Sequence, residues 1–319
     1  MKKILGLLAF VLLLNGCNDG DVKVQNISFE NVVASSTCSN LVYKIKGNET
    51  LIITTDLLAA FKNEITAVGV PRSIAIGTTA KVIYRNYNGV PTGNSFCVTP
   101  PQAYPSVVEE WNAIGGTMEV TTTAQITTDI VTNATRIVGY NHFIVFKNVT
   151  FQKPSGSQVY SSFVFGNFAT STTLTFPFGT PIALTRCSSG MTNTVYGRYG
   201  SEAIVINNID PNLIINTVTP AIRTGLIGNA INIISYKIYN ATLPIDFFCA
   251  VIPPTVPTFL EQWNADAGTS NIIGSIEVTT VTNGPQFIHQ IHLKGATLRK
   301  SSGLTFYLGD DYYLGDLSY

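Results

Sequence analysis

Short apolar runs with alternating character recur through most of the chain. Examples are Leu51–Thr54, Lys81–Tyr84 and Phe143–Phe146. Glycine, asparagine and proline separate these runs at the intervals typical of antiparallel β-sandwiches and barrels. The pattern therefore predicts an all-β, mainly antiparallel, β-sandwich-like fold.

Two segments interrupt the alternation and predict short helices. Each begins with a hydroxyl residue followed three positions later by glutamate, which is the spacing of a helix capping box. The segments are Pro105–Glu109 and Pro257–Glu261. A further short helix is expected after Asp56, and Asp210-Pro211 is a weaker counterpart because β-branched residues follow it.

The two tryptophans of the chain follow these capping boxes. Trp111 and Trp263 share a helical face with the preceding valines or with phenylalanine and leucine. We therefore expect both to be structural residues, each buried at the base of its module. The alternative is an exposed ring on which a sugar stacks.

The whole pattern occurs twice in the chain. Three segments recur at one offset of 152 residues: Tyr84–Asn88 as Tyr236–Asn240, Phe96-Cys97 as Phe248-Cys249, and Glu109–Ala113 as Glu261–Ala265. Collinear matches of this kind indicate an internal repeat. We therefore expect two tandem copies of one β module, 27–170 and 171–319, each with one or two short helices.

The N-terminus has the composition of an export signal. Lys2 and Lys3 precede an apolar run, Ile4–Leu14, which is shorter than the roughly 20 residues that span a bilayer. The run ends in Leu14-Asn15-Gly16-Cys17, which resembles the lipobox of bacterial lipoproteins. This resemblance implies a signal peptide over 1–17 and lipidation of Cys17. The alternative is an ordinary cleaved signal peptide that contains a cysteine.

Residues 18–26 are expected to form a short acidic tether. A cysteine followed by acidic residues resembles the export signal of surface lipoproteins in the Bacteroidota, particularly flavobacteria. That resemblance implies a lipid anchor in the outer membrane, at the cell surface or the periplasmic face, so the membrane is an expected partner.

The charge balance disfavours nucleic acid as a partner. Without Lys2 and Lys3 the chain has 19 − 2 = 17 basic residues against 19 acidic ones, a net charge of −2. Such a chain has no basic field for a phosphate backbone. Charged residues are only 12% of the total, so threonine, serine, asparagine and glycine must supply the polar surface, and these favour strands and turns.

The four cysteines after Cys17 occupy equivalent positions in the two modules. Four thiols allow three pairings, and the repeat favours Cys38 with Cys97 and Cys187 with Cys249. Each bridge would close a loop of about 60 residues and stabilise the fold by about 4 kcal/mol in the chain-entropy model. Four buried free thiols are the alternative. A zinc site is less favoured because no Cys-x-x-Cys spacing occurs.

The three histidines do not form a metal motif. His142 and His289 lie at equivalent positions and alternate with apolar neighbours, so each is expected to be partly buried with backbone partners. His289 and His292 have an odd spacing, which places them on opposite faces of a strand.

Searches for catalytic motifs identify no candidate. The sequence has no nucleophile elbow, phosphate-binding loop or dinucleotide fingerprint. Asp310, Asp311 and Asp316 cluster near the C-terminus, where a solvated turn is favoured over a calcium site. We therefore predict no catalytic residue, no metal ligand and no cofactor.

The leading functional hypothesis is a non-catalytic binding or assembly module of the cell envelope, with a glycan or a protein as its ligand. One rival is a glycan-acting enzyme that uses carboxylates on module loops, and another is a structural spacer. Two or more acids gathered in one cleft would favour the enzyme.

Overall fold

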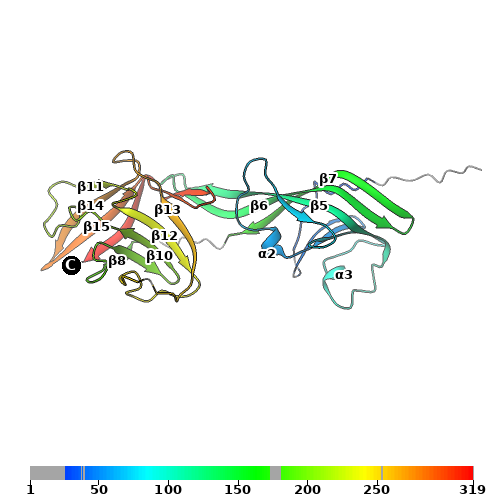
Figure 1. The fold of residues 1–319 in the computed structure, drawn as a ribbon, viewed down its shortest axis with the longest axis horizontal. Coiled ribbons are helices and arrows are strands. Elements are labelled where there is room, and N and C mark those ends of the chain that lie inside the picture. The colour runs from blue at the N-terminus through cyan, green and yellow to red at the C-terminus, as the bar shows by residue number, and fades with distance from the viewer. Residues whose placement is uncertain (1–25, 37, 39, 173–180, 253, 319) are drawn as a thin grey trace, which may run out of the picture. The chain divides into compact units, whose positions relative to one another are not determined.

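The chain is nearly all β. A computed structural model describes residues 26–36, 38, 40–172, 181–252 and 254–318. Strands make up 54% of the chain and helices 3%, in two curled antiparallel or mixed sheets with two short helices. The expected all-β, sandwich-like fold is therefore confirmed (Figure 1).

The first sheet has seven strands. They are β1 (Leu41–Lys46), β2 (Glu49–Thr54), β3 (Arg72–Ala75), β4 (Lys81–Tyr87), β5 (Val107–Thr128), β6 (Thr135–Lys153) and β7 (Gly156–Ser171). Their order is β1-β2-β4-β5-β6-β7, and β3 also pairs with β5.

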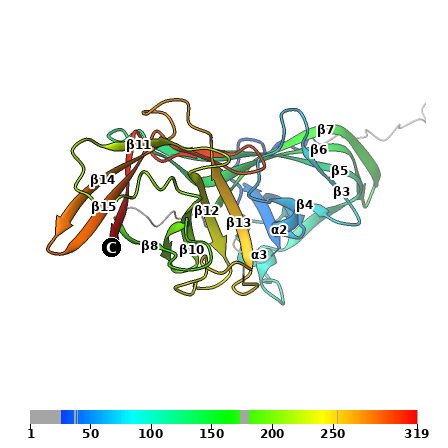
Figure 2. The ribbon, with the colours of Figure 1, turned by 60° about the vertical axis from the view of Figure 1, so that its left-hand side comes forward.

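The second sheet has eleven strands. They are β8 (Ile182–Arg186), β9 (Val195–Tyr199), β10 (Glu202–Asn207), β11 (Arg223–Leu226), β12 (Ile233–Tyr239), β13 (Phe259–Ala265), β14 (Ser275–Asn283), β15 (Gln286–Lys294), β16 (Thr297–Arg299), β17 (Thr305–Tyr307) and β18 (Asp311–Ser318). Their order is β11-β14-β15-β18-β8-β9-β10-β12-β13-β16-β17, and β8 pairs with β18 in parallel (Figure 2).

Two compact units divide the described chain. Unit 1 comprises 26–55, 74–118 and 145–166, and unit 2 comprises 56–73, 119–144 and the described residues from 167 onward. Strands β5, β6 and β7 contribute residues to both units. Unit 2 thus contains the described part of the second predicted module together with three stretches of the first, and the module boundary at 170 stays a prediction.

The strand pairings of the first half recur in the second. Tyr84 lies opposite Trp111 in the β4–β5 pair, and Tyr236 lies opposite Trp263 in the β12–β13 pair. In both pairs the register shifts just before the second tyrosine of the motif. The repeated sequence therefore forms repeated local structure.

The two halves of the chain differ in the length of their last strands, which are long in the first half and divided in the second. Strand β5 runs without a break for 22 residues and lies beside β6, which lies beside β7. In the second half, each of these long strands is replaced by two shorter strands that follow each other in the sequence. Strands β13 and β14 correspond to β5, β15 and β16 to β6, and β17 and β18 to β7. These breaks leave loops at 266–274, 295–296 and 308–310.

One of the expected helices is present. Helix α2 (Leu57–Ala60) follows Asp56, whose carboxylate accepts the backbone N–H groups of Leu58 and Ala59. The other helix, α3 (Asn94–Cys97), was not predicted. The counterpart of α2 at Asp210 is a turn, in which the carboxylate accepts the N–H of Asn212 at 2.9 Å.

The prediction of a helix at each of the two capping boxes is wrong. Val107 begins strand β5, and Phe259 begins strand β13. The backbone N–H of Ser106 donates to Asn88 Oδ1 at 2.9 Å, and that of Thr258 donates to Asn240 Oδ1 at 2.8 Å. These contacts hold the start of each strand against the preceding one, so β pairing replaces the helical turn.

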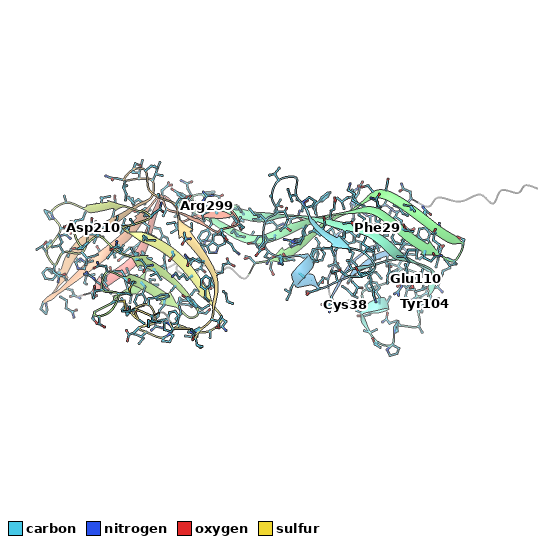
Figure 3. All side chains as sticks on the ribbon, in the orientation of Figure 1. Phe29, Cys38, Tyr104, Glu110, Asp210 and Arg299 are labelled. Carbon is cyan, nitrogen blue, oxygen red and sulfur yellow. A yellow bond between two sulfur atoms is a disulfide. The ribbon has the colours of Figure 1, made fainter. Side chains whose placement is uncertain are left out.

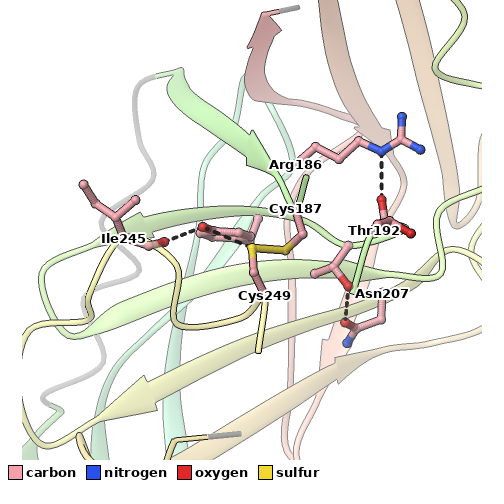
Figure 4. The surroundings of a disulfide bond; sticks show 8 residues. Arg186, Cys187, Thr192, Asn207, Ile245 and Cys249 are labelled. Carbon is pink, nitrogen blue, oxygen red and sulfur yellow. Dashed lines mark hydrogen bonds between the residues drawn. A yellow bond between two sulfur atoms is a disulfide. The ribbon is translucent and has the colours of Figure 1, made fainter. Parts of the chain in front are cut away.

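Both disulfides lie where the repeat placed them. Cys38 is bonded to Cys97, and Cys187 to Cys249, with Cα–Cα distances of 5.5 and 5.2 Å. Around the second bridge, the Tyr196 hydroxyl donates to the carbonyl of Ile245 (Figure 4). Each bridge joins the start of its half of the chain to a later segment, between β4 and β5 in the first half and between β12 and β13 in the second.

The expected signal peptide, Cys17 and nearly all of the acidic tether lie outside the described residues, because the description starts at residue 26. Within the described part of the chain, no helix has both the length and the apolar character needed to cross a membrane.

Candidate binding pocket

A pocket of about 520 Å³ lies in unit 2. Its walls come from the β5–β6 turn with the start of β6, from β17 and the start of β18, and from Thr172 and Pro181. The lining residues are Asp129, Thr132, Ala134, Thr135, Arg136, Ile137, Val138, Thr172, Pro181, Phe306, Tyr307, Leu308, Asp311, Tyr312 and Tyr313.

The pocket forms at the break between β17 and β18. The β5–β6 turn contacts this break: the N–H of Asp310 donates to the carbonyl of Thr132 at 3.0 Å, and Asn133 Nδ2 donates to Asp310 Oδ2 at 2.7 Å. Gly309 has a φ of +108°, and a Cβ there would lie 2.8 Å from the Thr132 carbonyl oxygen. The close approach therefore requires glycine.

Three half-buried tyrosines line the pocket. The Tyr307 hydroxyl donates to Asp310 at 2.8 Å, and the Tyr313 hydroxyl donates to Asp316 at 2.5 Å. The Tyr313 ring also stacks on His292 with centroids 4.6 Å apart. Burial raises the pKa of Tyr312, so its hydroxyl stays protonated at neutral pH. These contacts fix aromatic rings at the pocket wall.

The two carboxylates of the pocket already have protein partners. Asp129 accepts the backbone N–H groups of Thr132 and Val131, each at 2.9 Å, and these bonds lower its pKa. Burial raises the pKa of Asp311, but His292 at 2.7 Å and Lys294 at 2.9 Å outweigh it and lower the pKa overall. Both groups are therefore ionised at neutral pH.

Arg136 supplies the cation of the pocket. It is exposed on β6 and lines the pocket, and its positive charge contributes to the lowered pKa of Asp129. No described residue forms a hydrogen bond or ion pair with its guanidinium. Its donors are therefore available to a ligand.

The aspartates singled out near the C-terminus do not converge on one point. Asp310 bonds Asn133 and Tyr307, Asp311 bonds His292 and Lys294, and Asp316 bonds Tyr313. Among the described residues, no group of three or more histidine, cysteine or acidic side chains could hold a metal ion.

The glutamates of the expected capping boxes bind tryptophan instead. Trp111 Nε1 donates to Glu109 at 2.7 Å, and Trp263 Nε1 donates to Glu261 at 2.6 Å. On a strand, residues two apart share a face, which explains the contact. The next residue is Glu110, labelled in Figure 3. Its side chain belongs to the other face of the strand and pairs with Arg85 at 2.7 Å.

Both tryptophans are buried, at 1% and 0% exposure for Trp111 and Trp263. Trp111 packs against Tyr84 with ring centroids 4.7 Å apart, and Lys153 Nζ lies 4.4 Å from the centre of its ring. Trp263 packs against Phe306 at 5.1 Å. A ring enclosed in this way cannot serve as a sugar-stacking surface.

The equivalent histidines are more deeply buried than expected, and the partners of their ring nitrogens include side chains, where backbone groups were expected. In the first half, Arg72 donates to the Thr122 hydroxyl at 3.4 Å. The same hydroxyl oxygen lies 2.9 Å from His142 Nδ1. His142 Nε2 lies 3.0 Å from the Thr170 hydroxyl, which donates to Asn63 at 2.7 Å.

The second half repeats this chain of hydrogen bonds. Arg223 donates to the Thr280 hydroxyl at 2.8 Å, which lies 2.8 Å from His289 Nδ1, and Nε2 lies 3.0 Å from Asn216 Oδ1. Asn216 Oδ1 can only accept, so Nε2–H donates to it, and Nδ1 of the neutral ring accepts from the Thr280 hydroxyl. The hydrogen of the neutral ring is then on Nε2.

Burial lowers the pKa of both His142 and His289 to about 4, and the charge of Arg72, or of Arg223 and Arg186, adds to the effect. Both rings are therefore neutral at pH 7. His292 lies on the opposite face of β15 from His289, as its spacing predicts, and pairs with Asp311.

A second, more open hollow of unit 2 is lined by Glu64, Glu261 and Asp266. Its acids are partly neutralised, because Arg299 pairs with Asp266 at 2.8 Å and Lys300 pairs with Glu261 at 3.0 Å. The pocket at the β17–β18 break has tyrosine walls and a guanidinium that no described residue pairs with, so it is the stronger candidate site.

Comparison with known proteins adds no relative. No protein family matches the chain, and neither a curated protein nor a solved structure is significantly similar to it.

Proposed function

We propose that the protein is a lipid-anchored protein of the bacterial cell envelope that binds a ligand without converting it. The observation that carries the proposal is the tyrosine-walled pocket at the β17–β18 break. The pocket lies at a break between strands that the first half of the chain lacks. A repeat that keeps its core but changes one loop region is typical of a scaffold that carries a binding site.

The electrostatics of the pocket favour binding over hydrolysis. A glycosidase needs one carboxylic acid that holds a proton until it reaches the leaving group, and therefore a raised pKa. The pKa values of Asp129 and Asp311 are both lowered, so neither carries that proton at neutral pH.

A glycan-acting enzyme remains the second candidate, because two carboxylates do line one pocket. An experiment with polysaccharide from the envelope of the producing cells distinguishes a binding protein from an enzyme. We expect the purified chain to retain this material on a column and to release no new reducing ends. Release that is lost in Asp311→Asn, or in Asp129→Asn, would make the enzyme the better description.

The same column tests the spacer alternative. Tyr307→Ala should reduce retention, because it removes one wall of the pocket. Tyr199→Ala, which removes an exposed tyrosine outside the pocket, is the matched control and should retain as much material as the unmodified chain. Equal retention by both variants would favour a purely structural role.

The anchoring proposal rests on Leu14-Asn15-Gly16-Cys17. Cys17→Ala removes the thiol that receives the lipid, so the protein should move from the membrane fraction to the soluble fraction and lose radiolabel from a palmitate precursor. Cys38→Ala, which affects only a disulfide, should keep the label. Unchanged fractionation of Cys17→Ala would show that the membrane association has another origin.

A further inference from the structure

We propose that the pocket at the β17–β18 break takes a neutral sugar, bound between the tyrosine wall and the ionised groups around Arg136. This inference rests on the proposed binding function and names the chemical class of the ligand.

The first argument is the shape and composition of the walls. Tyr307, Tyr312 and Tyr313 come from one short stretch of chain, and none of them is fully buried. Flat aromatic surfaces beside a few polar groups suit the C–H faces of a sugar ring. The volume of about 520 Å³ lies within the range of small-molecule sites, roughly 300–1,000 Å³, and has room for a short oligosaccharide.

The second argument is the supply of hydrogen bonds. Arg136 offers donors that no described residue uses. Asp129 Oδ1 accepts both backbone N–H groups of its turn, and this carboxylate lies on the solvent-exposed rim of the pocket, where it can also accept from a ligand hydroxyl. Each sugar hydroxyl can donate to a carboxylate and accept from a guanidinium, so one ligand satisfies both kinds of group.

The third argument is charge. The lining residues comprise one cation, Arg136, and two anions, Asp129 and Asp311, which gives 1 − 2 = −1. The neighbouring Asp310, Asp316 and Lys294 bring the sum to 2 − 4 = −2. This field repels an anionic ligand, while an ammonium group, which only donates, cannot accept the hydrogen bonds that Arg136 offers. A neutral polyhydroxyl ligand carries neither penalty.

The test is a titration of the full mature chain with Cys17→Ala, to keep it soluble, against tetrasaccharides of three kinds. These are neutral glucose, mannose and galactose oligomers, uronic acid oligomers with the same linkages, and deacetylated chitosan oligomers. We expect at least one neutral oligomer to bind, and its uronic acid counterpart to bind at least tenfold more weakly.

Arg136→Gln should weaken binding of that neutral oligomer about tenfold or more and leave the melting temperature nearly unchanged, because the side chain is exposed and forms no hydrogen bond or ion pair with a described residue. Tyr307→Ala should abolish binding, while Tyr307→Phe should retain most of it because the ring remains. Arg299→Gln, which removes an exposed arginine outside the pocket, is the control and should bind normally.

Three results would overturn the inference: tighter binding of the uronic acid oligomers, tighter binding of the cationic oligomers, or no binding of any neutral oligomer. Each of these leaves the proposed binding function standing if envelope material is still retained in a Tyr307-dependent way. Loss of that retention would remove the binding function itself.

Discussion

Replacing Trp263 with alanine should lower the free energy of unfolding of unit 2 by about 3–5 kcal/mol, the usual cost of removing a large aromatic side chain from a core. Trp263 is fully buried, and it packs on Phe306 within a core that includes Tyr236 and Leu298. The substitution leaves a cavity there and deprives Glu261 of its indole donor.

Trp263→Phe is the matched variant. It keeps an aromatic ring in the core and removes only the N–H and part of the volume, so its loss should be clearly smaller than that of the alanine variant. Urea unfolding followed by far-ultraviolet circular dichroism measures both, and the fluorescence of the remaining Trp111 reports on unit 1. An alanine variant that unfolds at the same urea concentration as the unmodified protein would contradict a structural role.

Trp111 gives the same prediction for unit 1. It lies opposite Tyr84 and donates to Glu109, as Trp263 lies opposite Tyr236 and donates to Glu261. Trp111→Ala should therefore destabilise unit 1 by a similar amount, about 3–5 kcal/mol. If it removed binding to glycans and left the unfolding curve intact, the tryptophan would be a ligand contact.

The repeat made the long-range pairings predictable from the sequence. Internal comparison aligned Cys38 with Cys187 and Cys97 with Cys249, and one pairing scheme then applied to both halves. The alternation around His142 predicted its inward face in the same way. Both features depend on periodicity or on self-similarity, which the sequence contains directly.

Local signals failed where tertiary pairing competed with them. Ser106 and Glu109 have the spacing of a capping box, but Val107 and Val108 are β-branched, and Val107 and Glu109 pair with Tyr87 and Asn86 of β4. Pairing with β4 satisfies more backbone groups than one helical turn would, so the segment is a strand. Glu109 then finds its donor two residues away, at Trp111.

The pocket was beyond sequence reasoning because its walls are far apart in the chain. Asn133 and Asp310 form a hydrogen bond across a separation of 177 residues. The sequence did show Asp310, Asp311 and Asp316 as a cluster. Nothing in the pattern, however, indicated that the turn bearing Asp129 and the nearby Arg136 would meet them.

Lowering the pH from 7.5 to 4 should destabilise unit 2 strongly through His142 and His289. Burial, together with nearby arginines, lowers both pKa values from 6.5 to about 4. As the pH falls through 6.5, both histidines of the unfolded chain take up a proton, while those of the folded chain stay neutral until the pH approaches 4. This stability is complete above pH 6.5 and is lost as the pH falls toward 4, by about 3 kcal/mol for each histidine.

The hydrogen-bond chains explain why protonation is unfavourable. Nδ1 of each ring accepts from a threonine hydroxyl that itself accepts from an arginine. A proton on Nδ1 would displace the hydroxyl hydrogen from this bond and would add a positive charge beside that arginine in a buried site.

Urea unfolding at pH 7.5, 6.5, 5.5 and 4.5 measures the effect. The double variant His142→Gln/His289→Gln, although less stable at pH 7.5, should lose most of the pH dependence between 6.5 and 4.5, because glutamine does not titrate. His292→Gln is the control, since His292 is on the surface and pairs with Asp311, and it should keep the full dependence. An unchanged slope in the double variant would mean that carboxylates, and not the buried histidines, set the acid limit of the fold.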